Sequence, residues 1–165
     1  MTNPNSPSTV NADEAQSFLT GYLGTTPAPV TLIGEGAWSR CFGFQHDGQE
    51  LAIRFGRYVD DFEKDRLAHR YASLALPIPE VLAIGAYGDG YYAISTRVHG
   101  IPLEAVDAAH WNALLPALVA ALEAMRTADL SATAGYGGWG ADGNGAVASW
   151  PEHLLAVDLD APDRR

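Results

Sequence analysis

The hydrophobic pattern near the start of the chain predicts a helix. Ala15, Phe18 and Leu19 recur at the spacing of one helical face. Asn11 occupies a position where an N-cap residue is preferred, and Gly24 stands where a left-handed C-cap residue is usual. We therefore expect a helix that begins after Asn11 and ends at Gly24.

The pattern then changes to the short apolar runs, bounded by Gly, Pro and Asp, that are typical of strands. Asp47-Gly48 is a hairpin signal between the second and third runs, and GDG at residues 88–90 turns the chain between the last two. A short helix with mixed faces is expected over residues 60–74. The five expected strands are residues 29–34, 38–45 and 50–55 and the segments VLAIGAY and YYAISTRV.

A longer amphipathic helix is expected over residues 108–128. Its apolar stripe consists of Trp111, Leu114, Leu115, Leu118, Leu122 and Met125. Pro116 either kinks this helix or marks a break near its start. Residues 129–148 are rich in glycine, and over residues 135–145 we expect a flexible loop, the alternative being a border of an acceptor cleft. A last short helix is expected over residues 151–159.

This order of elements predicts an α+β fold: a five-stranded antiparallel sheet with one crossing helix, followed by a helical part. Strands and helices do not alternate as they do in a doubly wound sheet. A Rossmann fingerprint needs its glycines to open a helix, whereas Gly34 and Gly36 lie between two strands. The order of elements therefore disfavours a dinucleotide-binding fold.

Composition and charge narrow the classes of function. The chain has 20 acidic and 10 basic residues and a net charge of −10 at pH 7, which disfavours nucleic acid as a partner. Cys41 is the only cysteine, so an internal disulfide and a thiolate zinc site are excluded. The first residues do not form a signal peptide, and no apolar run approaches a membrane span. We therefore expect a cytoplasmic protein with no membrane partner.

The stretch GEGAWS is a candidate phosphate-binding loop. Gly34 and Gly36 permit positive φ and leave room for phosphate oxygens to approach backbone N–H groups, and Glu35 lies between them. Ser39 stands where a kinase loop has its third glycine, and its hydroxyl adds a donor. Taken alone, the stretch fits a simple turn between two strands at least as well.

A candidate phosphate-binding cation follows on the third strand. The segment LAIR is similar to the V-A-I-K segment of a kinase, with Arg54 where the lysine usually stands. A guanidinium binds phosphate oxygens with two parallel hydrogen bonds. An acidic partner on the crossing helix would hold it in place, and we expect Asp65 in that role, with Glu63 as the alternative. An exposed arginine and a solvated helix face remain the simpler interpretations.

The strand YYAISTRV supplies a candidate hinge. By position alone, its backbone over residues 95–98 would read the edge of a nucleobase, which makes Ser95, Thr96 and Val98 candidate nucleotide contacts. We interpret His99, in the linker that follows, as a surface or hydrogen-bonded histidine rather than a catalytic one.

These features together resemble the aminoglycoside phosphotransferases, especially the hygromycin B phosphotransferase branch, over about residues 11–157. The segments that carry the resemblance are GEGAWSRCFGF, LAIR, DFEKDR, ALPIPEVLAIG, YAISTRVHGIPLE and ADLSATAGYGGWGADGNG, with SW at residues 149–150. The resemblance implies a protein-kinase-like small lobe and transfer of phosphate from ATP or GTP, with Mg²⁺, to a hydroxyl of a small cationic aminoglycoside-like substrate. It also implies that an arginine at the position of Arg54 is compatible with activity.

The chain departs from this family in one respect. The family's H-x-D-x-x-x-x-N loop, which supplies the catalytic Asp and a metal-binding Asn, has no counterpart, because no histidine is followed by Asp two positions later. We therefore assign no catalytic and no metal-binding residue. Asp158 and Asp160 resemble a metal pair but are interpreted as part of a polar tail.

The resulting interpretation is a truncated phosphotransferase that is inactive by itself. We expect a disordered N-terminus over residues 1–10, a kinase-like lobe over 11–98, a hinge linker over 99–103 and a partial helical lobe over 104–165. The stripe on the helix of residues 108–128 is expected to be exposed and able to mediate self-association. The alternatives are a non-catalytic nucleotide-binding or scaffold module and an α+β structural protein with a coincidental glycine turn.

Overall fold

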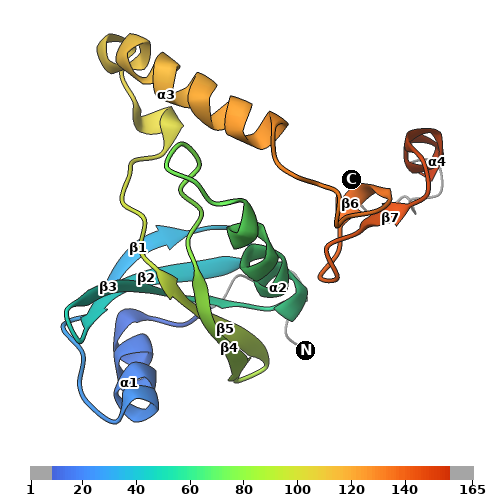
Figure 1. Ribbon diagram of the computed structural model, residues 1–165. Coiled ribbons are helices and arrows are strands. Elements are labelled where there is room, and N and C mark those ends of the chain that lie inside the picture. Colours follow the sequence, from blue (N-terminus) through green and yellow to red (C-terminus); the bar gives the residue numbers. More distant parts are fainter. Residues whose placement is uncertain (1–8, 157–165) are drawn as a thin grey trace.

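The computed structural model describes residues 9–156, and its largest element is a five-stranded antiparallel sheet in the order β1-β2-β3-β5-β4 (Figure 1). This sheet confirms the fold class expected from the sequence. The strands are β1 (Thr31–Glu35), β2 (Ser39–His46), β3 (Gln49–Gly56), β4 (Val81–Tyr87) and β5 (Gly90–Thr96).

The β2–β3 turn forms where the sequence predicts it. Asp47 and Gly48 have φ values of 49° and 75°, the two positive values that a tight two-residue hairpin turn requires. The pairing that follows is regular from His46↔Gln49 to Ser39↔Gly56. Because the register is regular, side chains on β2 and β3 alternate strictly between the two faces of the sheet.

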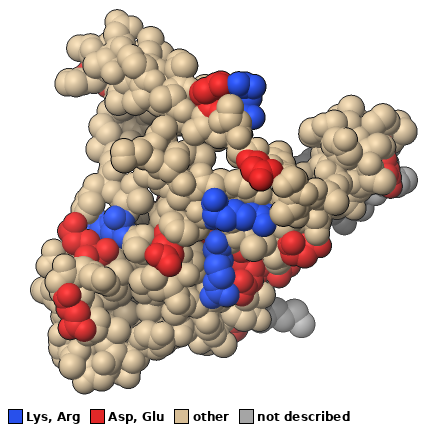
Figure 2. Space-filling model, in the orientation of Figure 1, with Lys and Arg blue, Asp and Glu red and all other residues tan. Residues whose placement is uncertain are grey.

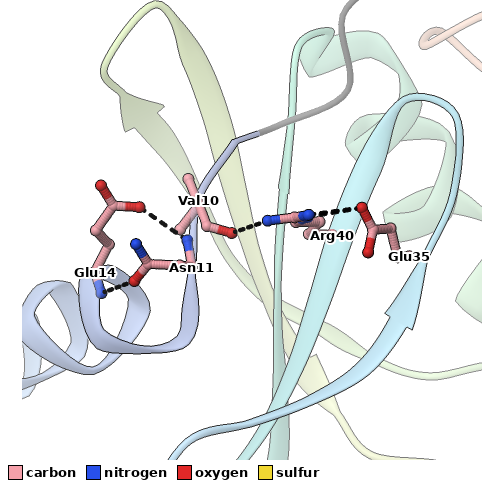
Figure 3. A network of polar contacts seen from close by, with 5 residues as sticks. All are labelled: Val10, Asn11, Glu14, Glu35 and Arg40. Atoms are coloured by element: carbon pink, nitrogen blue, oxygen red, sulfur yellow. Dashed lines mark hydrogen bonds and ion pairs between the residues drawn. The ribbon is translucent and has the colours of Figure 1, made fainter.

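Helix α1 (Ala12–Leu23) covers one face of the sheet. Asn11 and Glu14 form a capping box at its start, and Gly24, with φ of 70°, ends it in the left-handed conformation. Both ends lie where the sequence places them. Figure 3 shows the capping box beside the carbonyl of Val10, which accepts a hydrogen bond from Arg40 of β2. The entry to α1 is therefore tied to the sheet.

The hydrophobic core lies between α1 and this face of the sheet. Ala15 and Leu19 of α1 are fully buried there. The strand residues that meet them are Phe42, Phe44, Leu51, Ile53, Phe55, Tyr92 and Ile94. Phe18 adds aromatic contacts with Phe55, Tyr87 and Tyr92. The core side chains of β2, β3 and β5 thus lie on the face that α1 covers, and the opposite face of the sheet takes no part in this core.

Helix α2 (Val59–Ala68) crosses from β3 to β4 and contacts the sheet at the β4 and β5 side. Its single buried residue, Phe62, packs beside Gly56, where an added Cβ would lie 3.0 Å from the phenyl ring. The expected helix over residues 60–74 is shorter in the structure, because a 3-10 turn (His69–Tyr71) follows α2 and an irregular segment leads to β4.

Helix α3 (Ala108–Arg126) follows the short 3-10 turn Leu103–Ala105 and extends away from the sheet (Figure 1). It contains Pro116 without a break, and none of its residues is buried. The expectation of an exposed stripe agrees with the exposed side chains of Trp111, Leu115, Leu122 and Met125. Within residues 9–156, no helix is long and apolar enough to cross a membrane.

The glycine-rich segment is not the loop that we expected. It forms a hairpin of β6 (Tyr136–Trp139) and β7 (Gly145–Val147), followed by α4 (Trp150–Leu155). Gly137 has a φ of 88°, and an added Cβ on Gly145 would lie 2.3 Å from the backbone N of Tyr136. These glycines thus allow the two strands to approach closely and the backbone to turn, and they do not indicate a disordered segment. The expected end of the last helix at residue 159, and the pair Asp158 and Asp160, lie outside the described residues.

Candidate functional site

The candidate site lies on the face of the sheet opposite α1, where three strands present matching rows of residues. Cys41, Arg54 and Ala93 are paired across β2, β3 and β5 in one row. Gly43, Ala52 and Ser95 form the next row. All of these residues except Arg54 are small, so the face is hollow between its flanking elements.

A cavity of about 290 Å³ occupies this hollow, and we call it the hinge cavity. Residues of all five strands line it, with β4 contributing only its first residue, and α2 and the segment before β4 complete the walls. The lining residues include Ile33, Cys41, Ala52, Arg54, Asp65, Ile78, Val81, Ala93, Ser95, Thr96, Arg97 and Val98. Most of the lining is apolar, and the two arginines and one aspartate are its charged groups.

Arg54 is the best-anchored cation in the site. Its guanidinium forms an ion pair with the carboxylate of Asp65 on α2 and lies 4.7 Å from the ring centroid of Phe62. Glu63, the alternative partner, instead pairs with Arg66 at 3.0 Å. About one third of the Arg54 side chain remains exposed, so donor groups stay accessible from the cavity. Asp65 and Phe62, both on the crossing helix α2, therefore hold the guanidinium of Arg54 in place.

A second cavity of about 320 Å³, which we call the loop cavity, adjoins the first. Trp38 and Ser39 line it from the glycine stretch, and Arg57 and Lys64 add positive charge. Arg54 and Asp65 line both cavities. The ion pair thus stands at the junction of an apolar hollow and a more polar, cationic one.

The glycine stretch itself lines neither of these cavities at Gly34, Glu35 or Gly36. Gly34 and Gly36 do not use positive φ, which corrects the reason that we gave for them. An added Cβ on either glycine would have only ordinary or distant contacts, and the nearest is Cys41 at 3.8 Å. Neither backbone conformation nor internal packing requires glycine here, and the bare backbone is open to close approach from outside.

The polar groups of this stretch are partly engaged within the protein. The N–H of Gly36 donates to the carbonyl of Ser39 at 2.9 Å and closes the turn. The Glu35 carboxylate accepts hydrogen bonds from Nε and Nη2 of Arg40 at 3.0 and 2.7 Å (Figure 3). In this arrangement the side chain of Glu35 fastens β1 to β2 and, through Arg40, to the start of α1.

The three hinge candidates all line the hinge cavity. Thr96 also joins the segment before β4, because its hydroxyl accepts from the N–H of Glu80 at 2.9 Å. His99 lies beyond the cavity, with its ring nitrogen 2.8 Å from the carboxylate of Glu50. This contact also lowers the pKa of Glu50. His99 is therefore a hydrogen-bonded surface histidine, as the sequence suggested.

Sequence reasoning did not single out several residues that line the hinge cavity, among them Cys41, Ala52 and the side chain of Arg97. Strand alternation was the available signal, because a cavity-facing Arg54 places Ala52 on the same face. Cys41 then follows from the hairpin register, in which it is opposite Arg54. Burial raises the pKa of the Cys41 thiol, against the smaller effects of Arg54 and Arg97, so the thiol stays protonated in this hollow.

The antiparallel sheet, the crossing helix and the arginine–aspartate pair together have the arrangement of a kinase-like small lobe. Comparison with known proteins makes the class specific. The chain is 38% identical over 150 residues to hygromycin-B 4-O-kinase of Escherichia coli. The aligned residues make up 90% of this chain and 44% of that protein. No family model matches the chain.

Solved structures agree with this relationship. The crystal structure of aminoglycoside phosphotransferase APH(4)-Ia superposes with a TM-score of 0.82 and 34% identity, covering 90% of this chain and 50% of that one. A thermostable mutant of the same enzyme, in a ternary complex with AMP-PNP and hygromycin B, gives a TM-score of 0.80 over 87% of this chain and 49% of that one. The chain thus matches the N-terminal portion of these phosphotransferases and spans about half of their length.

Proposed function

We propose that this chain forms the nucleotide-binding part of a phosphotransferase that uses ATP or GTP to phosphorylate a hydroxyl of a hygromycin-like aminoglycoside. The observation that carries the proposal is the anchored Arg54 at the junction of the two cavities. The relatives support it, since one is a hygromycin-B kinase and two of the solved structures hold AMP-PNP or ADP together with hygromycin B.

The two cavities suit the two ends of a nucleotide. The hinge cavity offers an apolar hollow over Ala52 and Ala93, where a planar base fits beneath the sheet and beside the backbone of residues 95–98. The phosphates then extend past Arg54 into the loop cavity, toward Ser39 and the open backbone of the glycine stretch. Arg54 binds the phosphate oxygens, and Asp65 holds its guanidinium in that position.

The charge of the chain suits a cationic acceptor. Its net charge of −10 favours the approach of a polycationic aminoglycoside and repels nucleic acid. Figure 2 shows basic side chains gathered near the position of α2, with acidic ones around them. Two cations of α2 are paired on the helix itself, Lys64 with Asp61 at 3.8 Å and Arg66 with Glu63. Arg54, Arg57 and Lys64, which line the loop cavity, supply the positive charge at the proposed position of the phosphates.

The described residues do not fit the Mg²⁺ ion that the family implies. Between residues 9 and 156, no three His, Cys, Asp or Glu side chains gather as a metal site. Beside Arg54, the carboxylate of Asp65 is already engaged by the guanidinium. Mg²⁺ prefers several oxygen ligands in octahedral geometry. We therefore derive no step through a metal from these residues.

A second candidate function is a nucleotide-binding module without catalysis. The observation that favours it is that none of the five histidines is followed by Asp two positions later, so the family's catalytic loop is not present in these 165 residues. The proposal for this chain alone is therefore nucleotide binding without phosphoryl transfer.

Calorimetry and a transfer assay on the purified 165-residue chain test this proposal together. We expect saturable binding of ATP to one site and no incorporation of phosphate into hygromycin B when γ-labelled ATP and Mg²⁺ are supplied. The E. coli hygromycin-B kinase serves as the positive control for the transfer assay. Metal-dependent labelling of hygromycin B by the chain would refute the inactive assignment, and the absence of ATP binding would refute the nucleotide-site assignment.

The single thiol provides an independent test of the hinge cavity. Because burial raises the pKa of Cys41, less thiolate is present at a given pH, and alkylation should be slower than in the denatured chain. Because a thiol with a raised pKa ionises only at higher pH, the rate of alkylation should keep rising with pH beyond the ordinary range of a free thiol. ATP should slow the labelling further. Mass spectrometry of iodoacetamide-treated chain at several pH values measures both effects, and labelling at the denatured-chain rate would contradict them.

A further inference from the structure

Arg97 is the second arginine of the hinge cavity. It follows β5, and its N–H donates to the carbonyl of Glu50 at 3.2 Å, so it extends the pairing with β3 by one more step. By strand alternation its side chain shares a face with Ser95 and Ala93. Arg97 therefore belongs to the ceiling of the cavity, two rows beyond the row of Arg54.

The path of the Arg97 side chain explains a buried glycine on β2. An added Cβ on Gly43 would lie 2.7 Å from Nη1 and 3.1 Å from Cζ of Arg97, and 3.2 Å from Cγ2 of Ile33. Gly43 does not have a positive φ, so backbone conformation does not require glycine. The glycine instead leaves room for the guanidinium to lie flat against the strand beside Ile33.

The guanidinium of Arg97 forms no ion pair with a carboxylate within residues 9–156, although its charge contributes, after His99 and Gln45, to lowering the pKa of Glu50. Nor does this guanidinium donate a hydrogen bond within those residues, in contrast to Arg54, which pairs with Asp65. The nearest acidic strand residue, Glu50, directs its carboxylate to His99. A half-buried cation in a mainly apolar hollow is thus left with its planar face and donors available to a ligand.

The position of Arg97 indicates which part of a ligand it meets. Four residues along a strand, as from Ser39 to Gly43, span about 13 Å. Ser39 lies in the loop cavity, at the phosphate end, whereas Arg97 lines only the hinge cavity. A guanidinium stacks favourably on aromatic faces, and stacking on a base tolerates different bases.

We propose that Arg97 binds the nucleobase by stacking its guanidinium on the base, with Gly43 providing the space, while Arg54 binds the phosphates. This inference rests on the nucleotide site of the proposed function. It assigns separate ends of the nucleotide to the two arginines of one cavity.

Fragments of the nucleotide separate the two roles in calorimetry on the full 165-residue chain at fixed salt. We expect R97M to weaken ATP, GTP and adenosine by about fivefold to thirtyfold each and to leave tripolyphosphate within about twofold. R97K, which keeps the charge without the planar fork, should recover only part of the loss. R126M, at an exposed arginine of α3, should change none of these affinities.

A double substitution tests the spatial link. G43A should weaken adenosine in the wild-type background and have a smaller effect in R97A, because the clash with the guanidinium is then gone. Thermal melts identify any variant that fails to fold. Loss of tripolyphosphate rather than adenosine in R97M, or no loss of either, would overturn the inference. If the wild-type chain binds ATP but not adenosine or GTP, base stacking is overturned while the nucleotide site stands; if it binds no ATP, the proposed function fails as well.

Discussion

Leu19→Ala is expected to lower the free energy of unfolding by about 2–5 kcal/mol, a large fraction of the stability of an ordinary domain. Leu19 has no exposed surface and lies in the core between α1 and the sheet. Its truncation leaves a cavity among aromatic side chains that cannot all close around it. Denaturation in urea, followed by circular dichroism, measures the change.

Leu74→Ala is the matched control for this substitution. It removes the same atoms from a side chain that is 95% exposed, so the expected change stays within about 0.5 kcal/mol. Equal effects of the two substitutions would contradict the packing of α1 on the sheet. Because Leu19 packs on the face opposite the hinge cavity, the folded fraction of Leu19→Ala should still bind ATP with unchanged affinity.

The sheet could be predicted from the sequence because its signals are local. Asp47-Gly48 defines a hairpin through its own backbone preference, and the alternation on either side then determines the register. Asn11 and Gly24 likewise mark the ends of α1 by their capping chemistry. Each of these signals lies within a few residues of the structure that it specifies.

The glycine-rich hairpin could not be predicted in the same way. Its strands are only four and three residues long, and the contacts that hold it involve residues distant in sequence. Arg70, in the 3-10 turn that follows α2, lies 5.9 Å from the ring centroid of Trp139, and Gly143 packs beside the same guanidinium. Glycine content alone does not distinguish such a hairpin from a mobile loop, because both need positive φ.

The candidate site was predicted in part. Arg54 and Asp65 are found by their order along the chain, and the structure forms this pair rather than the one with Glu63. Arg97 was predicted only as part of the hinge backbone, because the place of its side chain depends on Gly43, which lies on a strand that does not pair with β5. A contact of that kind appears only once the strands are assembled.

Arg54→Met is expected to weaken ATP binding by about tenfold to a hundredfold. A hydrogen bond to a charged group contributes about 1.5–3 kcal/mol, and the substitution removes the donors that face the phosphates while it keeps an apolar stem over Phe62. The midpoint of unfolding should change little, since the Arg54–Asp65 pair is partly exposed and such pairs contribute little to stability. Calorimetry with ATP at fixed ionic strength measures the affinity.

Arg66→Met is the control for Arg54→Met, because it removes the same charge from α2 at a side chain that pairs with Glu63 outside both cavities. We expect at most a small, salt-dependent change in ATP affinity, because removing this charge alters only the long-range electrostatic field at the site. Equal weakening by the two substitutions would show that ATP responds only to net charge. Unchanged affinity in Arg54→Met would remove the phosphate-binding role of Arg54. A loss confined to Arg54→Met, and absent for adenosine, would place the phosphates at the junction of the hinge cavity and the loop cavity, where Asp65 holds the guanidinium.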